Sequence, residues 1–118
     1  MNLKGKVAVV TGGARDIGRA VSLKLAAEGA RVALNYYASE EQAEDTLKSI
    51  RDAGGEAIAV GGDMTKQADV DKLVAETVAA FGEKIDVLVN VVGGIVARKT
   101  IEEADLEFVE FLMKLNYS

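Results

Sequence analysis

The sequence predicts an α/β fold, an open doubly wound parallel sheet with helices on both faces. Short apolar runs at residues 7–10, 31–36, 56–60 and 85–92 alternate with segments whose apolar residues recur every three or four positions. The first run is apolar at consecutive positions, which is typical of a strand covered on both sides. A length of 118 residues suits one core. We therefore treat residues 1–118 as a single domain.

The helices between these strands have recognisable boundaries. The first is expected from Ile17 onward, and the second after Ser39, which forms a Ser-x-x-Gln capping box with Gln42. The third has an apolar face over residues 70–81 and is expected to stop at Gly82. A fourth is expected from Thr100, where Thr-Ile-Glu-Glu is another capping box.

Four strands in this arrangement predict the order 3-2-1-4, with the switch point between strands 1 and 4. A complete two-halved sheet of this type has about six strands, so the sheet is expected to be truncated after about four. Strand 4 would then be an uncovered edge, and residues 106–115 would place apolar side chains around much of the last helix. We expect the chain alone to self-associate or to fold poorly.

Composition excludes several classes of protein. The net charge is −5 and the pI about 4.8, with no basic run beyond Arg98 and Lys99, which argues against a nucleic-acid or membrane surface. No signal-peptide pattern or membrane-length apolar stretch is present, so a cytoplasmic location is expected. The chain contains no His and no Cys, so it cannot form a Ser-His-Asp triad, a thiolate nucleophile or a His/Cys metal site.

The junction of the first strand and first helix is rich in glycine. Thr11 and Gly12 close the strand, and Gly18 lies inside the helix. Glycine there lets the backbone approach a diphosphate, whose charge meets the N–H groups that open the helix at Ile17. A Walker-type loop is excluded because Arg19, not Lys, follows Gly18. A plain turn that uses glycine only for its backbone angles is the alternative.

This spacing resembles the short-chain dehydrogenase/reductase family, whose fingerprint is Thr-Gly-x3-Gly-x-Gly. Thr11, Gly12 and Gly18 match it, whereas Asp16 replaces the middle glycine. An acid beside a diphosphate would be repulsive, so we expect Asp16 to cap the helix. Arg15 and Arg19 flank it and could offset its charge.

Three further segments resemble the same family in the same order. Asp63 and Met64 are similar to the pair that holds the adenine, although Asp63 and Thr65 could simply cap the next helix. Asn90 and Gly93 match two positions of the family's Asn-Asn-Ala-Gly segment, which borders the nicotinamide ribose. Asn116 resembles the Asn of the catalytic tetrad, although an Asn near a helix end is also a common terminator.

The end of the second strand bears on the choice of cofactor. An acid there would bind the ribose hydroxyls of NAD and repel the additional phosphate of NADP. The sequence instead has Asn35 and Tyr36, and Arg15 is available as a phosphate partner. NADP(H) is therefore favoured over NAD(H).

The resemblance implies a Rossmann-type oxidoreductase that transfers hydride between NADP(H) and a small carbonyl or alcohol substrate. The apolar residues of segment 106–115 separately predict a homo-oligomer. The segment Gly-Gly-Ala-Arg-Asp-Ile-Gly-Arg-Ala and the Asn-Tyr strand end are closest to the 3-oxoacyl-acyl-carrier-protein reductases. The family's reaction also needs a Ser and a Tyr with Lys four residues later. None of the tyrosines, Tyr36, Tyr37 and Tyr117, has that Lys. We expect this chain to be inactive; the alternative is a non-catalytic nucleotide-binding or oligomeric module.

Overall fold

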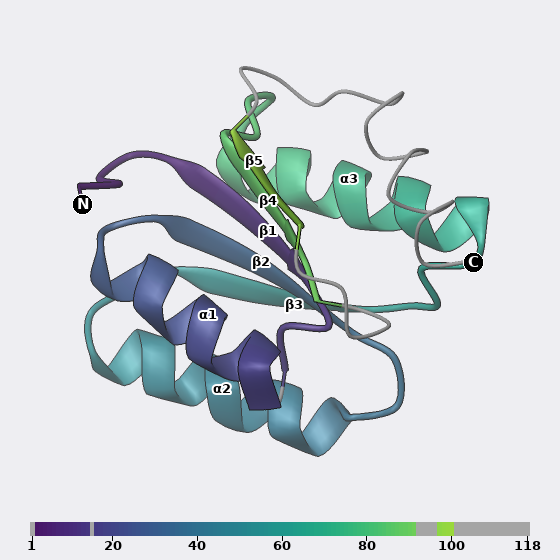
Figure 1. The fold of residues 1–118 in the computed structure, drawn as a ribbon, viewed down its shortest axis with the longest axis horizontal. Coiled ribbons are helices and arrows are strands. Elements are labelled where there is room, and N and C mark those ends of the chain that lie inside the picture. Colours follow the sequence, from purple (N-terminus) through teal and green to yellow (C-terminus); the bar gives the residue numbers. More distant parts are fainter. Residues whose placement is uncertain (1, 15, 92–96, 101–118) are drawn as a thin grey trace.

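The computed structural model describes residues 2–14, 16–91 and 97–100 (Figure 1). Strands and helices alternate along the chain as β1 Val7–Thr11, α1 Asp16–Ala27, β2 Arg31–Tyr36, α2 Glu40–Asp52, β3 Ala57–Gly61, α3 Gln67–Phe81 and β4 Val87–Asn90. These four strands are parallel and lie in the order β3-β2-β1-β4. The predicted fold class and strand order are confirmed. The boundaries of β2 are as expected, and those of the other three strands differ by at most two residues.

The sheet separates two apolar layers (Figure 1). On one face, α1 and α2 pack against alternate residues of β1, among them Ala8 and Val10. On the other face, α3 packs against Val7 and Val9. All five residues of β1 are buried, because a central strand of a doubly wound sheet has helices on both sides. The consecutive apolar positions of this run are thereby explained.

A fifth strand, β5 Ala97–Thr100, pairs antiparallel with β4. The expectation that β4 is an uncovered edge is therefore wrong, and β3 and β5 are the two edges. Its sequence, Ala-Arg-Lys-Thr, has no apolar run, so periodicity did not reveal it; charged residues are common on edge strands. Thr100, the expected cap of a fourth helix, ends this strand. The remainder of that helix lies outside the described residues.

The helix ends test the capping predictions. Gly82 follows α3 with φ of +99°, and its N–H donates to the carbonyl of Val78, which confirms the predicted stop. Ser39 is the N-cap residue of α2, but its side chain makes no capping hydrogen bond. The expected capping box is therefore wrong in its bonding, although it marks the start of the helix correctly.

Candidate functional site

The turn from β1 into α1 brings two backbone segments unusually close together. Gly12 has φ of +67°, the left-handed region that favours glycine. A Cβ atom added to Gly18 would lie 1.7 Å from the carbonyl oxygen of Gly12. No side chain can occupy that space. The amino-terminal turn of α1 therefore lies directly against the end of β1, and the fingerprint glycines at both positions have a steric reason.

Asn35, the penultimate residue of β2, holds this turn in place through hydrogen bonds. Its side chain is buried, and its Oδ1 accepts a 3.2 Å hydrogen bond from the N–H of Gly12. Its backbone carbonyl accepts another from the N–H of Gly13 at 2.9 Å. Its Nδ2 donates to the carbonyls of Val60 and Gly62 at 3.3 and 3.1 Å. The carboxamide thus connects the carboxyl ends of β1, β2 and β3.

The sequence predicts Asn35 as a cofactor-binding residue at the end of the second strand. It does not predict the hydrogen bonds of Asn35 to the chain at the carboxyl ends of β1 and β3. The bonded carbonyls lie 25 and 27 positions further along the chain. No local pattern contains such distant partners. The preceding apolar run, which marks β2 as a buried strand, is the one available signal that a polar residue here must find partners inside the protein.

The ends of β1 and β4 are joined by a second buried bond. The hydroxyl of Thr11 donates to Oδ1 of Asn90 at 2.7 Å, and these two residues are register partners in the sheet. Asn90 is fully buried and Thr11 is 5% exposed. Between β1 and β4 the chain order of the sheet reverses, which in this class of fold is where ligands bind.

Asp16, which replaces the family's middle glycine, begins α1 with φ of +54°. Among the residues that the structure describes, it is the one non-glycine residue with positive φ. Asp tolerates this left-handed region better than most residues, whereas glycine occupies it without penalty. The departure from the fingerprint is therefore compatible with the turn. The helix-capping role of Asp16 stays a prediction.

Asp63 follows β3, so it lies at the same carboxyl ends of the strands as Asn35 and Thr11. Its Oδ1 accepts hydrogen bonds from the N–H of Thr65 at 2.9 Å and from its hydroxyl at 2.6 Å. These two donors lower the pKa of Asp63 below its ordinary value, so the carboxylate is charged at neutral pH. The suggestion that Thr65 caps the next helix is wrong, because the N-cap of α3 is Lys66.

The other predicted site residues fall into distinct environments. Ile17, at the exposed start of α1, is 61% exposed. Tyr36 is partly buried, and its ring lies against Gly61, where an added Cβ would come within 3.0 Å of it. Met64 is buried among the residues that pack α3 on the sheet. Arg15, Gly93 and Asn116 lie outside the described residues.

Arg19, which was expected to offset the charge of Asp16, is engaged elsewhere. Its guanidinium donates to the hydroxyls of Thr46 and Ser49 at 2.8 and 3.1 Å, and lies 3.2 Å from a carboxylate oxygen of Asp45. All three partners belong to α2. The side chain therefore connects the two helices on this face of the sheet.

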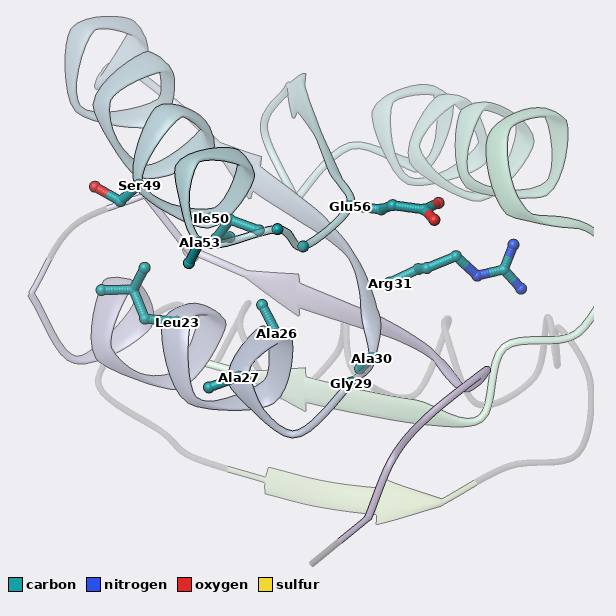
Figure 2. A pocket seen from close by; sticks show the side chains of 12 residues that line it. Leu23, Ala26, Ala27, Gly29, Ala30, Arg31, Ser49, Ile50, Ala53 and Glu56 are labelled. Atoms are coloured by element: carbon teal, nitrogen blue, oxygen red, sulfur yellow. The ribbon is translucent and has the colours of Figure 1, made fainter.

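A separate hollow lies between α1 and α2 (Figure 2). Leu23 and Ala26 of α1 line it together with Ile50 of α2 and Ala53, the residue that follows α2. It includes the residues that precede β2 and β3, so it lies at the amino ends of the strands, away from the glycine turn. None of the predicted site residues lines this hollow.

The part of the chain that the structure describes comprises residues 2–14, 16–91 and 97–100. No group of three or more acidic, His or Cys side chains is arranged to hold a metal ion there. No helix in this part of the chain is long and apolar enough to cross a membrane. The polar groups that do converge are those at the carboxyl ends of β1, β2, β3 and β4.

The arrangement is suited to binding a dinucleotide. The close approach of Gly18 to Gly12 leaves the start of α1 without a side chain at that point, and the first N–H groups of any helix lack partners within it. A diphosphate placed there would meet those donors and the positive end of the helix dipole. The carboxylate of Asp63 can accept a hydrogen bond from an amine.

Comparison with known proteins identifies the family. The family model for short chain dehydrogenases matches residues 6–118. The chain belongs to the short-chain dehydrogenase/reductase family. Its members bind a nicotinamide cofactor and act as oxidoreductases, which agrees with the resemblance predicted from the fingerprint.

Individual relatives agree with this assignment. The short-chain dehydrogenase/reductase homolog YusS of Bacillus subtilis is 44% identical over 90 residues, which cover 76% of this chain and 82% of YusS. The short-chain dehydrogenase/reductase structure from Serratia marcescens matches 98% of this chain with a TM-score of 0.78 and 34% identity. This chain covers 51% of that structure.

Another similar structure contains a nucleotide. A putative dehydrogenase from Burkholderia cenocepacia with bound NADP matches 75% of this chain, with a TM-score of 0.70 and 38% identity. The match covers 34% of that structure. The matches therefore span a third to a half of the length of these two solved structures.

Proposed function

We propose that this chain is the dinucleotide-binding part of an oxidoreductase that transfers hydride between NADP(H) and a small carbonyl or alcohol substrate. One observation supports this most directly. The contact between Gly18 and the carbonyl of Gly12 brings the amino terminus of α1 to the edge of the sheet where β1 and β4 end. Family membership supplies the reaction class.

The residues around this edge have separable roles in the proposal. The amides of Ile17 and Gly18 bind the diphosphate, and Asp63 accepts a hydrogen bond from the adenine amine. Asn35 acts by holding Gly12 and Gly13 in place, because its carboxamide is already bonded to backbone groups. The Thr11–Asn90 pair fixes the neighbouring strand ends, with Gly93 beyond it. The bound nicotinamide would supply or accept the hydride.

The preference for NADP(H) is part of this proposal. It is supported by the absence of an acid at positions 35–37 and by Arg15, which can pair with a phosphate. The Burkholderia cenocepacia relative with bound NADP is consistent with it. We also propose the 3-oxoacyl-acyl-carrier-protein reductases as the closest subgroup, and self-association through the apolar residues of segment 106–115.

Catalysis requires groups that this chain does not supply. Asn116 matches one member of the family's tetrad, but Glu residues stand four positions after Tyr36 and Tyr37, and the position four after Tyr117 lies outside residues 1–118. We therefore propose that the 118-residue chain binds nucleotide without reducing a carbonyl substrate.

A second candidate function is a nucleotide-binding or oligomeric module with no turnover of its own. The observation that favours it is YusS, most of whose length aligns with only 90 residues of this chain. YusS is therefore close in length to residues 1–118 of this chain. In its nucleotide-binding form the second candidate shares the nucleotide site with the first, and the two differ in whether a catalytic segment continues the polypeptide.

Titration calorimetry of the 118-residue chain with NADPH tests the binding step. We expect a saturable site that is lost in Gly18→Ala. In an activity assay with NADPH and a 3-oxoacyl thioester, we expect no oxidation of NADPH above the protein-free rate. A folded chain with no nucleotide site would contradict the first candidate and the nucleotide-binding form of the second. Reproducible turnover after stringent purification would contradict the assignment of catalysis to residues outside this chain.

A further inference from the structure

Thr46, in the middle of α2, contacts the glycine turn of a different element. It is fully buried, and its Oγ1 lies 2.8 Å from the carbonyl oxygen of Ala14, which is 32 positions earlier in the chain. The same oxygen accepts a 2.8 Å hydrogen bond from the guanidinium of Arg19. It also lies 2.9 Å from the carbonyl of Gln42, one helical turn back.

The single hydroxyl hydrogen of Thr46 can serve only one of these carbonyls at a time. The carbonyl of Gln42 already accepts the N–H of residue 46 within the helix. The carbonyl of Ala14 belongs to a turn and not to a helix. We therefore assign the hydroxyl hydrogen of Thr46 to the bond with Ala14. Donation from the charged Arg19 into the same oxygen polarises the O–H group and strengthens its bond to Ala14.

A second buried hydroxyl acts on the preceding carbonyl. Ser22 of α1, also fully buried, donates to the carbonyl of Gly13 at 3.1 Å. Two successive carbonyls of the turn are therefore held toward the protein interior. In a planar trans peptide the C=O and N–H groups point in opposite directions. A carbonyl held inward turns the positive end of its peptide dipole outward.

We propose that Thr46, held by Arg19, is a positioning residue that sets the shape of the glycine turn for binding a diphosphate. This inference rests on the proposed nucleotide-binding function. It adds that α2, which contributes none of the predicted site residues, determines how well the turn receives the ligand. Loss of the hydroxyl should relax the turn and weaken recognition of the diphosphate, while the adenine end of the site is unchanged.

The chain offers a matched control. Thr77 in α3 is also fully buried, and its hydroxyl donates to the carbonyl of Leu73 one turn back at 2.7 Å. Thr77→Val therefore removes a buried helical hydroxyl that does not contact the turn. Thr46→Val removes the bond to Ala14 with little change in volume, and Thr46→Ser retains the hydroxyl.

The first readout uses no nucleotide. Amide hydrogen exchange at Gly12 and Gly13, whose N–H groups are bonded to Asn35, should be about five- to tenfold faster in Thr46→Val. It should return to the wild-type rate in Thr46→Ser and be unchanged in Thr77→Val. Equal exchange in Thr46→Val and wild type would overturn the proposal, whatever the chain binds.

The second readout compares two ligands. In Thr46→Val, affinity for NADPH should fall about five- to tenfold, whereas affinity for adenosine should stay within about twofold. Adenosine lacks both the diphosphate and the additional phosphate that is proposed to pair with Arg15 in the same turn. Equal losses for both ligands would overturn the proposal in favour of general destabilisation. If wild type binds neither ligand, the proposed function fails, and amide exchange still decides the role of Thr46.

A second substitution keeps the test decisive if Thr46→Val does not fold. Arg19→Met leaves the Thr46 hydroxyl in place but removes its N–H donor, and it should shift both readouts in the same direction by a smaller factor. If Thr46→Val is unfolded, Arg19→Met carries the test. Wild-type exchange at Gly12 and Gly13 in folded Arg19→Met would then overturn the proposal.

Discussion

The hydroxyl of Thr11 donates a 2.7 Å hydrogen bond to Oδ1 of Asn90, and this buried bond joins the carboxyl ends of β1 and β4. Thr11→Val retains the shape of the side chain but leaves that carboxamide oxygen without this donor. We expect a loss of about 1–3 kcal/mol in the free energy of unfolding. Urea denaturation measures it, with Thr11→Ser as the control that keeps the hydroxyl. Equal stability of the two variants would contradict this account.

Gly18→Ala should disrupt both folding and binding. Its Cβ would lie 1.7 Å from a backbone oxygen, so α1 must move away from β1, at a cost of about 3 kcal/mol or more. Gly54→Ala is the control. Gly54 has φ of +89° but no atom within 4 Å of an added Cβ, so about 1 kcal/mol of backbone strain is expected. Thermal denaturation should rank the variants in that order, and the reverse order would exclude the steric explanation.

Asp16→Gly and Asp16→Asn separate the backbone and charge effects of the unusual fingerprint residue. Because Asp16 has φ of +54°, glycine should stabilise the fold by up to about 1 kcal/mol. Both substitutions remove a negative charge from the start of α1, so both should strengthen NADPH binding a few-fold at low salt, and less at high salt. Unchanged affinity of Asp16→Asn would show that this charge does not reach the diphosphate.

Arg15→Glu tests the proposed preference for NADP(H). If Arg15 pairs with the additional phosphate, affinity for NADPH should fall by about tenfold or more, whereas affinity for NADH should fall much less. Lys48→Glu, an equal change of charge at an exposed pair with Asp52, is the control for long-range electrostatics. Calorimetry with both nucleotides measures the difference. Equal losses for NADPH and NADH would remove Arg15 from this role.

The lowered pKa of Asp63 has a specific cause in Thr65. Thr65→Val removes the hydroxyl donor and should raise that pKa toward its ordinary value. A carboxyl whose folded pKa is lowered adds stability that is complete above the ordinary value and is lost as the pH falls through the lowered one. Side-chain carboxyl NMR titration measures the shift, with Thr65→Ser as the control. An unshifted titration in Thr65→Val would assign the lowering to another group.

Most of the layered fold could be predicted from the sequence because its signals are local. The apolar run of β1, the boundaries of β2 and the stop at Gly82 each depend on residues that are close together in the chain. Strand order followed from general rules of chain connection. The antiparallel strand β5 could not be found in this way, because its sequence, Ala-Arg-Lys-Thr, has no apolar run.

The candidate site was predictable in position but only partly in detail. The fingerprint located the turn, since Gly12 and Gly18 are six residues apart. The supporting bonds were not predictable, because Asn35 and Thr46 contact the turn across 23 and 32 positions of sequence. A capping pattern also failed at Ser39, where the residue lies at the expected place without the expected bond. Hydrogen bonding depends on geometry that a pattern of residue types does not contain.

The bonding of Asn35 limits how coenzyme selectivity could be redesigned. An acid at the end of β2 is the obvious means of converting an NADP-preferring enzyme to NAD, and Asn35→Asp is the smallest such change. The new carboxylate would turn one oxygen toward the carbonyls of Tyr36, Val60 and Gly62, which now receive the amide hydrogens. Buried oxygen would then face buried oxygen. An engineered acid belongs instead at Tyr37, which is 74% exposed. A substitution there leaves the hydrogen bonds of Asn35 intact.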